Sequence, residues 1–141
     1  MTGDDALLPY SSAVEAALYF YAASALIRYM LADHEITRDE LFAVGATFTL
    51  VAWAFAYSYT VCQAIEPGGF TAAVDPNGDR SWMELLFLSV TTLSSTGLSD
   101  VVPIKAFARG LVMLEQLAGI AYVAMVVSRL VGLLVMRPSA D

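Results

Sequence analysis

The sequence holds a single cysteine and a single histidine among its 141 residues. One cysteine excludes a disulfide within the chain and any metal site built from several thiolates, so Cys62 is expected to be a small apolar packing residue. One histidine cannot assemble a metal site without partners. His34 stands in the charged stretch DHEITRDE and is expected to be a solvated loop residue.

Positive charge is also scarce, because seven Lys and Arg residues face 14 Asp and Glu residues, for a formal net charge of −7. This balance argues against a nucleic-acid partner, which requires clustered cationic side chains to neutralise phosphates. The sequence shows no glycine-rich phosphate loop, nucleotide fingerprint or Ser/His/Asp set. We therefore expect no enzyme, no cofactor and no small-molecule substrate, with small cations as the natural counter-charge.

Long apolar runs dominate what is present, and 58% of the residues are hydrophobic against 15% charged. Residues 41–65 contain no charged side chain and exceed the roughly 20 residues that a helix needs to cross a bilayer. Residues 110–136 form a second run, interrupted only by Glu115 and Arg129. We expect a multi-pass protein of the cell membrane with the lipid bilayer as its partner. The start, MTGDDALLPY, lacks a basic region, so no cleavable secretory signal is expected.

An earlier apolar stretch, residues 13–32, carries Glu15 near its start and Arg28 near its end. It could cross the membrane if Arg28 extends its guanidinium to the interface, or it could lie along the membrane surface. Its charges do not alternate as in a strongly amphipathic surface helix, which favours the crossing.

The connection between the two long runs begins with EPGGFTAAVDPNGDR, whose Gly, Pro, Asn and Asp residues predict an exposed loop. The run SWMELLFLSVTTLSS follows, with Ser81 and Glu84 spaced as in a helix capping box. A helix of about fourteen residues is too short to cross a bilayer, so the chain must enter and return.

The polar stretch TTLSSTGLSD follows this short helix, and non-helical backbone at membrane depth is tolerated only where protein buries it or it lines a water-filled cavity. The helix also directs its carboxyl end at the stretch, which favours a cation there. One copy of the loop cannot surround an ion, so we expect a cyclic homo-oligomer, whose number of chains these residues leave open.

Residues 91–103, TTLSSTGLSDVVP, resemble the T-x-G-Y-G-D signature and trailing proline of tetrameric potassium channels and their non-selective relatives. The stretch LVMLEQLAGIAYVAMVVSRLVGL is similar to the inner helix of small bacterial two-helix ion channels. The resemblance implies an all-α membrane protein in which two transmembrane helices flank a re-entrant pore helix and filter loop. It further implies a homotetramer around a central pore, with the N-terminal helix as an addition.

The resemblance divides the chain into segments. It implies an N-terminal helix and short link over residues 1–40 and a pore domain over 41–136. Within that domain it implies an outer helix at 41–65, a turret loop at 66–80, a pore helix at 81–94, a filter at 95–100 and an inner helix at 104–136. A short tail at 137–141 remains.

Residue by residue, the resemblance assigns the filter to Ser95, Thr96, Gly97, Leu98, Ser99 and Asp100. It implies monovalent cations, K⁺ or Na⁺, at Ser95, Thr96 and Gly97, where a hydroxyl and successive carbonyls of four chains form stacked rings. Thr92, Ser94 and Glu115 would support the filter from behind.

Two departures from the signature matter. Ser99 replaces a glycine that accepts left-handed backbone, at a cost on the order of 1 kcal/mol per chain, and Leu98 replaces the tyrosine that ties the filter to the pore helix. Phe87 stands where the family often has a tryptophan that bonds the aspartate. We infer a wider outer vestibule with fewer intact ion sites, and hence weak selectivity between K⁺ and Na⁺.

Along the inner helix, helical spacing places Ile120, Val123, Val127 and Val131 on one face, which the resemblance assigns to the cavity and gate. Gly119 occupies the position of the family's hinge glycine, although close helix packing would explain it equally well. Glu115 is an ionisable group at membrane depth, and we favour a protonated or hydrogen-bonded structural brace over a functional charge.

The sequence thus predicts a cation channel of altered filter sequence, STGLSD. A fully potassium-selective channel is one alternative, in which Ser99 is forced into the glycine conformation. A non-conducting membrane assembly protein is the alternative of another class.

Overall fold

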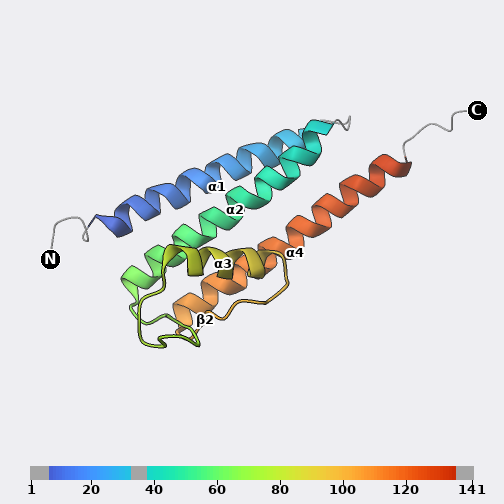
Figure 1. Cartoon of the computed structure of the whole chain (residues 1–141). Helices are drawn as coiled ribbons and strands as arrows, with labels where there is room; N and C mark the ends of the chain where they lie inside the picture. Colours follow the sequence, from blue (N-terminus) through green and yellow to red (C-terminus); the bar gives the residue numbers. More distant parts are fainter. Residues whose placement is uncertain (1–6, 33–37, 136–141) are drawn as a thin grey trace, which may run out of the picture.

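The computed structural model describes residues 7–32 and 38–135, which form four helices and one pair of short strands (Figure 1). In chain order the elements are α1 (Leu8–Ala32), α2 (Arg38–Ile65), β1 (Phe70–Thr71), α3 (Trp82–Leu93), β2 (Val102–Pro103) and α4 (Ala106–Val135). The prediction of an all-helical architecture, with a short helix between two long ones, is confirmed. The residues expected to form the tail, 137–141, lie outside the described residues, as does the part of the predicted link that contains His34, residues 33–37. The rest of that link is helical, because α2 begins at Arg38 rather than at the predicted residue 41.

Two of the described helices are long and apolar enough to cross a bilayer, over Leu41–Ile65 in α2 and Ala106–Gly132 in α4. Helix α4 begins at Ala106 rather than at the predicted residue 104. The backbone N–H groups of Ile104 and Lys105 bond to the carbonyl of Gly69, at 2.8 and 3.4 Å. These two residues therefore belong to the loop contact that precedes the helix.

Helix α1 lies antiparallel along α2 and starts at Leu8, before the beginning of the apolar stretch 13–32 (Figure 1). Its buried Ala16, Ala23 and Met30 recur every seven residues and form a narrow seam against α2. The small residues allow close approach of the two backbones, and Thr47 donates a hydrogen bond to the sulfur of Met30 at 3.7 Å. The first two helices therefore form a packed hairpin.

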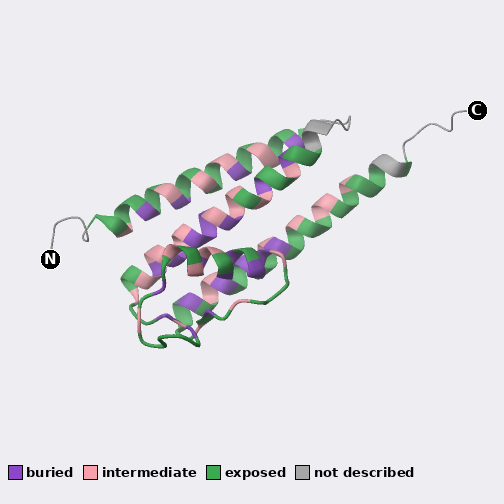
Figure 2. Ribbon diagram, in the orientation of Figure 1, coloured by how far each residue is buried: buried purple, intermediate pink, exposed green. Residues whose placement is uncertain are grey.

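The buried core lies at the end of the molecule where α2, α3 and α4 meet, whereas the far half of α4 is mostly half-buried or exposed (Figure 2). The core cluster consists of Phe55, Tyr59, Cys62, Phe70, Ala72, Leu85, Leu88, Val101, Ala108 and Val112. Cys62 is a fully buried member, as expected for an apolar packing residue.

The loop between α2 and α3 is not the uniformly exposed turret that its composition predicts. Phe70, Ala72 and Arg80 are buried in it. Strand β1 pairs antiparallel with β2, with Phe70 opposite Pro103 and Thr71 opposite Val102. The chain before α3 is thereby clasped to the chain that follows the predicted filter.

Candidate functional site

Helix α3 starts with the capping box that the sequence predicts. The Ser81 hydroxyl accepts a bond from the N–H of Glu84 at 3.3 Å, and the Glu84 carboxylate accepts one from the N–H of Ser81 at 2.7 Å. Ser81 and Ser94 are therefore the caps of α3 rather than helical residues. The bonds from Ser81, aided by the charge of Arg80, lower the pKa of Glu84, so the cap is complete at neutral pH and is lost only as the pH falls through that lowered value.

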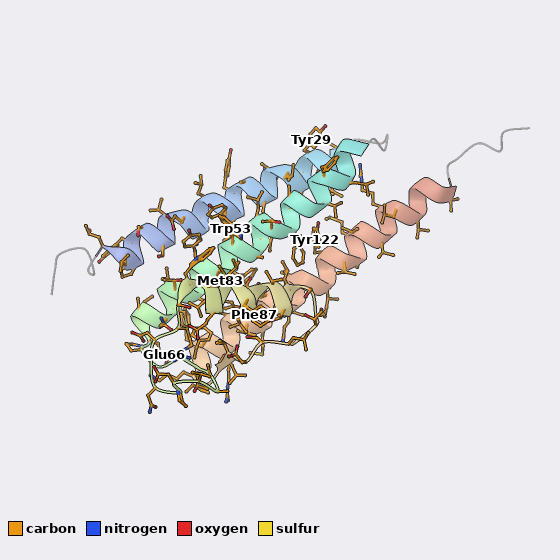
Figure 3. The ribbon with its side chains drawn as sticks, in the orientation of Figure 1. Tyr29, Trp53, Glu66, Met83, Phe87 and Tyr122 are labelled. Atoms are coloured by element: carbon orange, nitrogen blue, oxygen red, sulfur yellow. The ribbon has the colours of Figure 1, made fainter. Side chains whose placement is uncertain are left out.

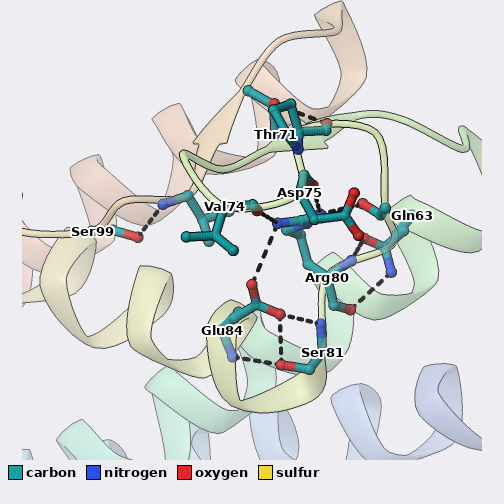
Figure 4. Close-up of polar contacts among 11 residues, drawn as sticks. Gln63, Thr71, Val74, Asp75, Arg80, Ser81, Glu84 and Ser99 are labelled. Carbon is teal, nitrogen blue, oxygen red and sulfur yellow. Dashed lines mark hydrogen bonds and ion pairs between the residues drawn. The ribbon is translucent and has the colours of Figure 1, made fainter.

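Arg80, immediately before this cap, binds the turret loop together (Figure 4). Its guanidinium donates to the carbonyls of Val74, Asp75 and Gly78 and pairs with Glu84 at 3.4 Å. The backbone of Arg80 is held as well, since its N–H and C=O both bond to the side chain of Gln63, at 2.8 and 3.0 Å. The side chains of Arg80 and Gln63 thus fix the loop conformation just before the cap of α3.

At the other end of α3, the chain turns so that three successive amide groups point back at the helix. The N–H of Ser95 bonds to the carbonyl of Thr92 at 3.0 Å. The N–H groups of Thr96 and Gly97 both bond to the carbonyl of Thr91, at 3.0 and 3.1 Å. The carboxyl end of the helix thereby holds the first half of the predicted filter.

This arrangement fixes the direction of the carbonyl groups. In a trans peptide the N–H points opposite to the C=O of the preceding residue, and the structure has no cis peptide bond among its described residues. The carbonyls of Ser94, Ser95 and Thr96 therefore point away from α3. Thr96 turns its hydroxyl back toward the Thr91 carbonyl at 3.3 Å, so its backbone rather than its side chain faces the open side.

Left-handed backbone occurs at Ser95, with φ of 61°, and at Gly97, with φ of 65°. Positive φ at Ser95 and Gly97 alternates with negative φ at Thr96, and such alternation can bring successive N–H groups to one side of the chain, as observed here. Ser99 is not among the described residues with positive φ, so it is not forced into the glycine conformation. Its hydroxyl instead accepts a bond from the N–H of Val101 at 3.1 Å (Figure 4). The strain of a non-glycine residue, on the order of 1 kcal/mol, falls on Ser95.

Side chains in the outer half of the predicted filter are exposed in the single chain. The Leu98 side chain is 76% exposed, and Asp100 is exposed too. Directly afterwards Val101 is buried in the core, and β2 pairs with β1. The segment is therefore anchored firmly at both ends, by α3 before it and by Val101 after it.

A hollow of about 310 Å³ opens beside the inner half of the segment. Its lining residues are Thr91, Thr92, Ser95, Gly97, Gln116 and Ile120. Gln116 was not predicted as a site residue. It precedes the predicted lining residue Ile120 by one helical turn, and this i, i+4 spacing is the sequence signal that could have identified it.

Helix α4 presents two faces. The predicted lining residues are exposed in the single chain, with exposed fractions of 61% for Ile120, 48% for Val123, 52% for Val127 and 51% for Val131. Gln116 lies on the same face, because about 100° of rotation per residue separates neighbours on a helix. The other face packs against α2 and α3 through Val112, Glu115 and Gly119, and Tyr122 on α4 reaches the Val44 carbonyl of α2 at 2.5 Å (Figure 3).

Gly119 touches α3 directly. A Cβ atom on it would lie 2.3 Å from the carbonyl oxygen of Leu93, a distance that real Cβ atoms do not adopt. The α4 helix continues through Gly119 without interruption. Of the two explanations for this glycine, the described structure supplies the packing contact.

Glu115 lies behind the hollow and is completely buried. Its carboxyl group contacts the hydroxyls of Tyr59 in α2 and Ser89 in α3. The sequence singled out Glu115 but not these two partners, which stand 56 and 26 residues away in the chain.

Comparison with known protein families identifies the family of this chain. A family model described as an ion channel, that of the potassium-channel pore family, matches residues 16–136. The chain belongs to this ion channel family. No curated protein and no solved structure matches it. The channel is therefore a multi-pass membrane protein and not an enzyme, with α2 and α4 as the membrane-spanning helices of its pore domain.

Family membership and geometry agree on the arrangement of elements. In this channel the short α3 stands between the two spanning helices, and its carboxyl end meets the segment 95–100. The hollow beside that segment is bordered by the exposed face of α4.

Proposed function

We propose that four copies of this channel surround a common axis and conduct monovalent cations past Ser95, Thr96 and Gly97. The observation that carries the proposal is the set of three amide N–H groups bonded to the end of α3. Because these amides face the helix, the carbonyls of Ser95 and Thr96 face the open side, where carbonyl oxygens from four chains replace the hydration shell of a cation. Fourfold symmetry closes the ring that one chain leaves open.

The hollow would then join its three copies as the water-filled cavity beneath the filter. Thr92, Ser95 and Gln116 supply polar groups at its upper rim, and the carboxyl end of α3 adds partial negative charge there. The stripe from Ile120 to Val131 continues downward as an apolar wall, which suits a hydrophobic gate. Thr91, which also lines the hollow, supports the filter through its carbonyl.

We further propose that the channel discriminates only weakly between K⁺ and Na⁺. Left-handed backbone occurs at Ser95 and Gly97 but not at Ser99, whose hydroxyl accepts the N–H of Val101 in a local turn. The Leu98 side chain extends outward without a polar group that could bond to α3. The outer rings of the family's filter would therefore be missing, which leaves fewer sites at which the two ions differ.

Reversal potentials of the reconstituted channel under opposed K⁺ and Na⁺ gradients measure this selectivity. We expect the two permeabilities to differ by less than about tenfold, or ~1.4 kcal/mol. The double substitution Leu98→Tyr with Ser99→Gly restores the G-Y-G-D part of the family signature and should raise the preference for K⁺.

Ser99→Ala is the matched control, because it removes the hydroxyl but keeps the Cβ atom that disfavours left-handed backbone. It should remain weakly selective. A strong K⁺ preference of the unmodified chain would contradict the weak selectivity, whereas a folded protein without any cation flux would favour the non-conducting assembly protein.

We also propose that α1 crosses the membrane beside α2. Helix α1 is not among the described helices that are long and apolar enough to cross a membrane, yet it lies along the membrane-spanning α2. Tyr19 stacks on Tyr57 at 5.6 Å and meets Trp53 edge-on at 5.5 Å, and Trp53 in turn contacts Trp82 of α3. These ring contacts hold α1 against the pore domain at membrane depth.

Three crossings place the two ends of α1 on opposite sides of the membrane. Single cysteines at Leu7 and Ala32, in a Cys62→Ser background, test this with a membrane-impermeant thiol reagent applied to sealed vesicles. We expect the reagent to label only one of the two positions from a given side. Labelling of both positions from the same side would show that α1 lies along the surface.

A further inference from the structure

Three polar side chains from three helices meet in the core behind the hollow. They are Tyr59 of α2, Ser89 of α3 and Glu115 of α4, and each has no exposed surface. Helix α3 carries the filter, and its Leu93 carbonyl contacts Gly119 of α4 one helical turn beyond Glu115. The cluster therefore lies next to the contact between α3 and α4, where it can fix the orientation of α3.

The contacts form a chain of oxygen atoms. The Tyr59 hydroxyl donates to one oxygen of the Glu115 carboxyl, and the Ser89 hydroxyl lies within bonding distance of the other. The same Ser89 hydroxyl is 2.8 Å from the backbone carbonyl oxygen of Ala52. Each of these three contacts needs a hydrogen atom between its two oxygens.

The number of hydrogens available for these contacts favours the acid form of Glu115. A serine hydroxyl has one hydrogen to donate, and a backbone carbonyl can only accept. If Ser89 donates to Ala52, its contact with Glu115 must be bridged by a hydrogen on the carboxyl group. An ionised Glu115 would leave two of these oxygens facing each other without a hydrogen, whereas the acid form satisfies all three contacts.

Within residues 7–32 and 38–135, the groups that face Glu115 supply no positive charge that would stabilise a carboxylate. Helix α2 presents Tyr59 and Cys62 to this region, α3 presents Ser89, and the groups that act on Glu115 are the two hydroxyls. Arg80 is occupied by the turret carbonyls and Glu84. A buried carboxylate without a cation is costly inside a protein and more so at membrane depth.

We propose that Glu115 is a neutral carboxylic acid and that its proton, donated to Ser89, holds the pore helix in position behind the filter. Glu115 is a positioning residue, because it acts on the ion path through α3. Its protonation state is independent of the proposed conduction, whereas its effect on flux rests on that function.

Infrared difference spectroscopy of the reconstituted channel observes the proton directly. A protonated carboxyl has a carbonyl stretch well separated from carboxylate bands and shifts in D₂O. At neutral pH, the spectrum of the unmodified chain minus that of Glu115→Gln should contain this band, and the band should be completely lost in the variant. Asp79→Asn is the matched control, because Asp79 is exposed in the turret and its removal should subtract only carboxylate bands.

A difference spectrum with carboxylate bands alone for Glu115→Gln would overturn the proposal. Flux and melting temperature provide the second arm. A glutamine amide can donate to Ser89 and accept from Tyr59, so Glu115→Gln should keep both properties near those of the unmodified chain, whereas Glu115→Leu should lose flux and melt lower. A leucine variant equal to the unmodified chain in both properties would show that the acid does not position α3.

Discussion

Replacing Gly119 with alanine is expected to abolish cation flux and to lower the melting temperature of the channel. The added methyl carbon would lie 2.3 Å from the Leu93 carbonyl oxygen and 3.0 Å from its carbonyl carbon. These atoms are backbone and cannot rotate away, so α3 and α4 must separate. Overpacking of this kind costs about 1–3 kcal/mol per chain. Leu93 ends α3, so the displacement reaches Ser95 and Thr96 directly.

Gly110→Ala is the matched control for this substitution. It lies in the same helix, and a Cβ atom there would meet no atom of the chain within 4 Å. Alanine should stabilise the helix at this position by up to about 1 kcal/mol. Thermal unfolding in detergent and flux from liposomes measure both variants. A Gly119→Ala channel with unchanged melting temperature but altered opening would assign the glycine to hinging instead.

The main elements could be predicted because their signals are local. A run without charges, residues 41–65, needs no partner to indicate a spanning helix, and Ser81 with Glu84 marks the start of α3 within four residues. The boundary at residue 104 was wrong because a distant group decides it. Ile104 and Lys105 bond to Gly69 across the turret, and nothing in their own neighbourhood indicates that contact.

In the candidate site too, the sequence revealed local features but not the contacts between distant residues. The sequence identified Glu115 as an unusual acid, but its partners Tyr59 and Ser89 are ordinary residues on other helices, and only the packing brings them together. Because Ser99 replaces a glycine of the signature, the sequence pointed to left-handed backbone as a possible strain in this segment. In the structure the left-handed serine is Ser95, which lies in the turn bonded to the end of α3, whereas Ser99 forms a local turn with Val101.

Arg80 is the residue whose importance the sequence concealed most. Within a loop rich in glycine, proline and aspartate it has the pattern of a solvated charge, yet it is 5% exposed. The N–H groups of its guanidinium bond to three carbonyls of the turret, those of Val74, Asp75 and Gly78. The loop has few apolar side chains of its own, so this polar centre takes the place of a core.

Arg80→Ala is therefore expected to cost about 3 kcal/mol per chain, because it removes the guanidinium donors of three part-buried carbonyls and of one Glu84 oxygen. Of these carbonyls, that of Asp75 keeps a bond within the turret, from the N–H of Gly78. The bonds between Gln63 and the backbone of residue 80 survive the substitution but cannot replace the guanidinium. Arg80→Lys should recover little of the loss, because one ammonium group cannot reach carbonyls on several sides. Melting temperature and the rate of proteolysis within residues 66–80 measure the effect.

Arg109→Ala separates this structural role from a role of charge. Arg109 is exposed, lies near the same end of the molecule and donates one bond, to the Pro103 carbonyl at 3.3 Å. Both substitutions remove one positive charge from the end of the molecule that holds the turret. A purely electrostatic effect would therefore raise the local cation concentration and the flux in both variants. We expect Arg109→Ala to keep its melting temperature and Arg80→Ala to lose stability and flux together. Equal melting temperatures would show that the turret does not depend on its buried arginine.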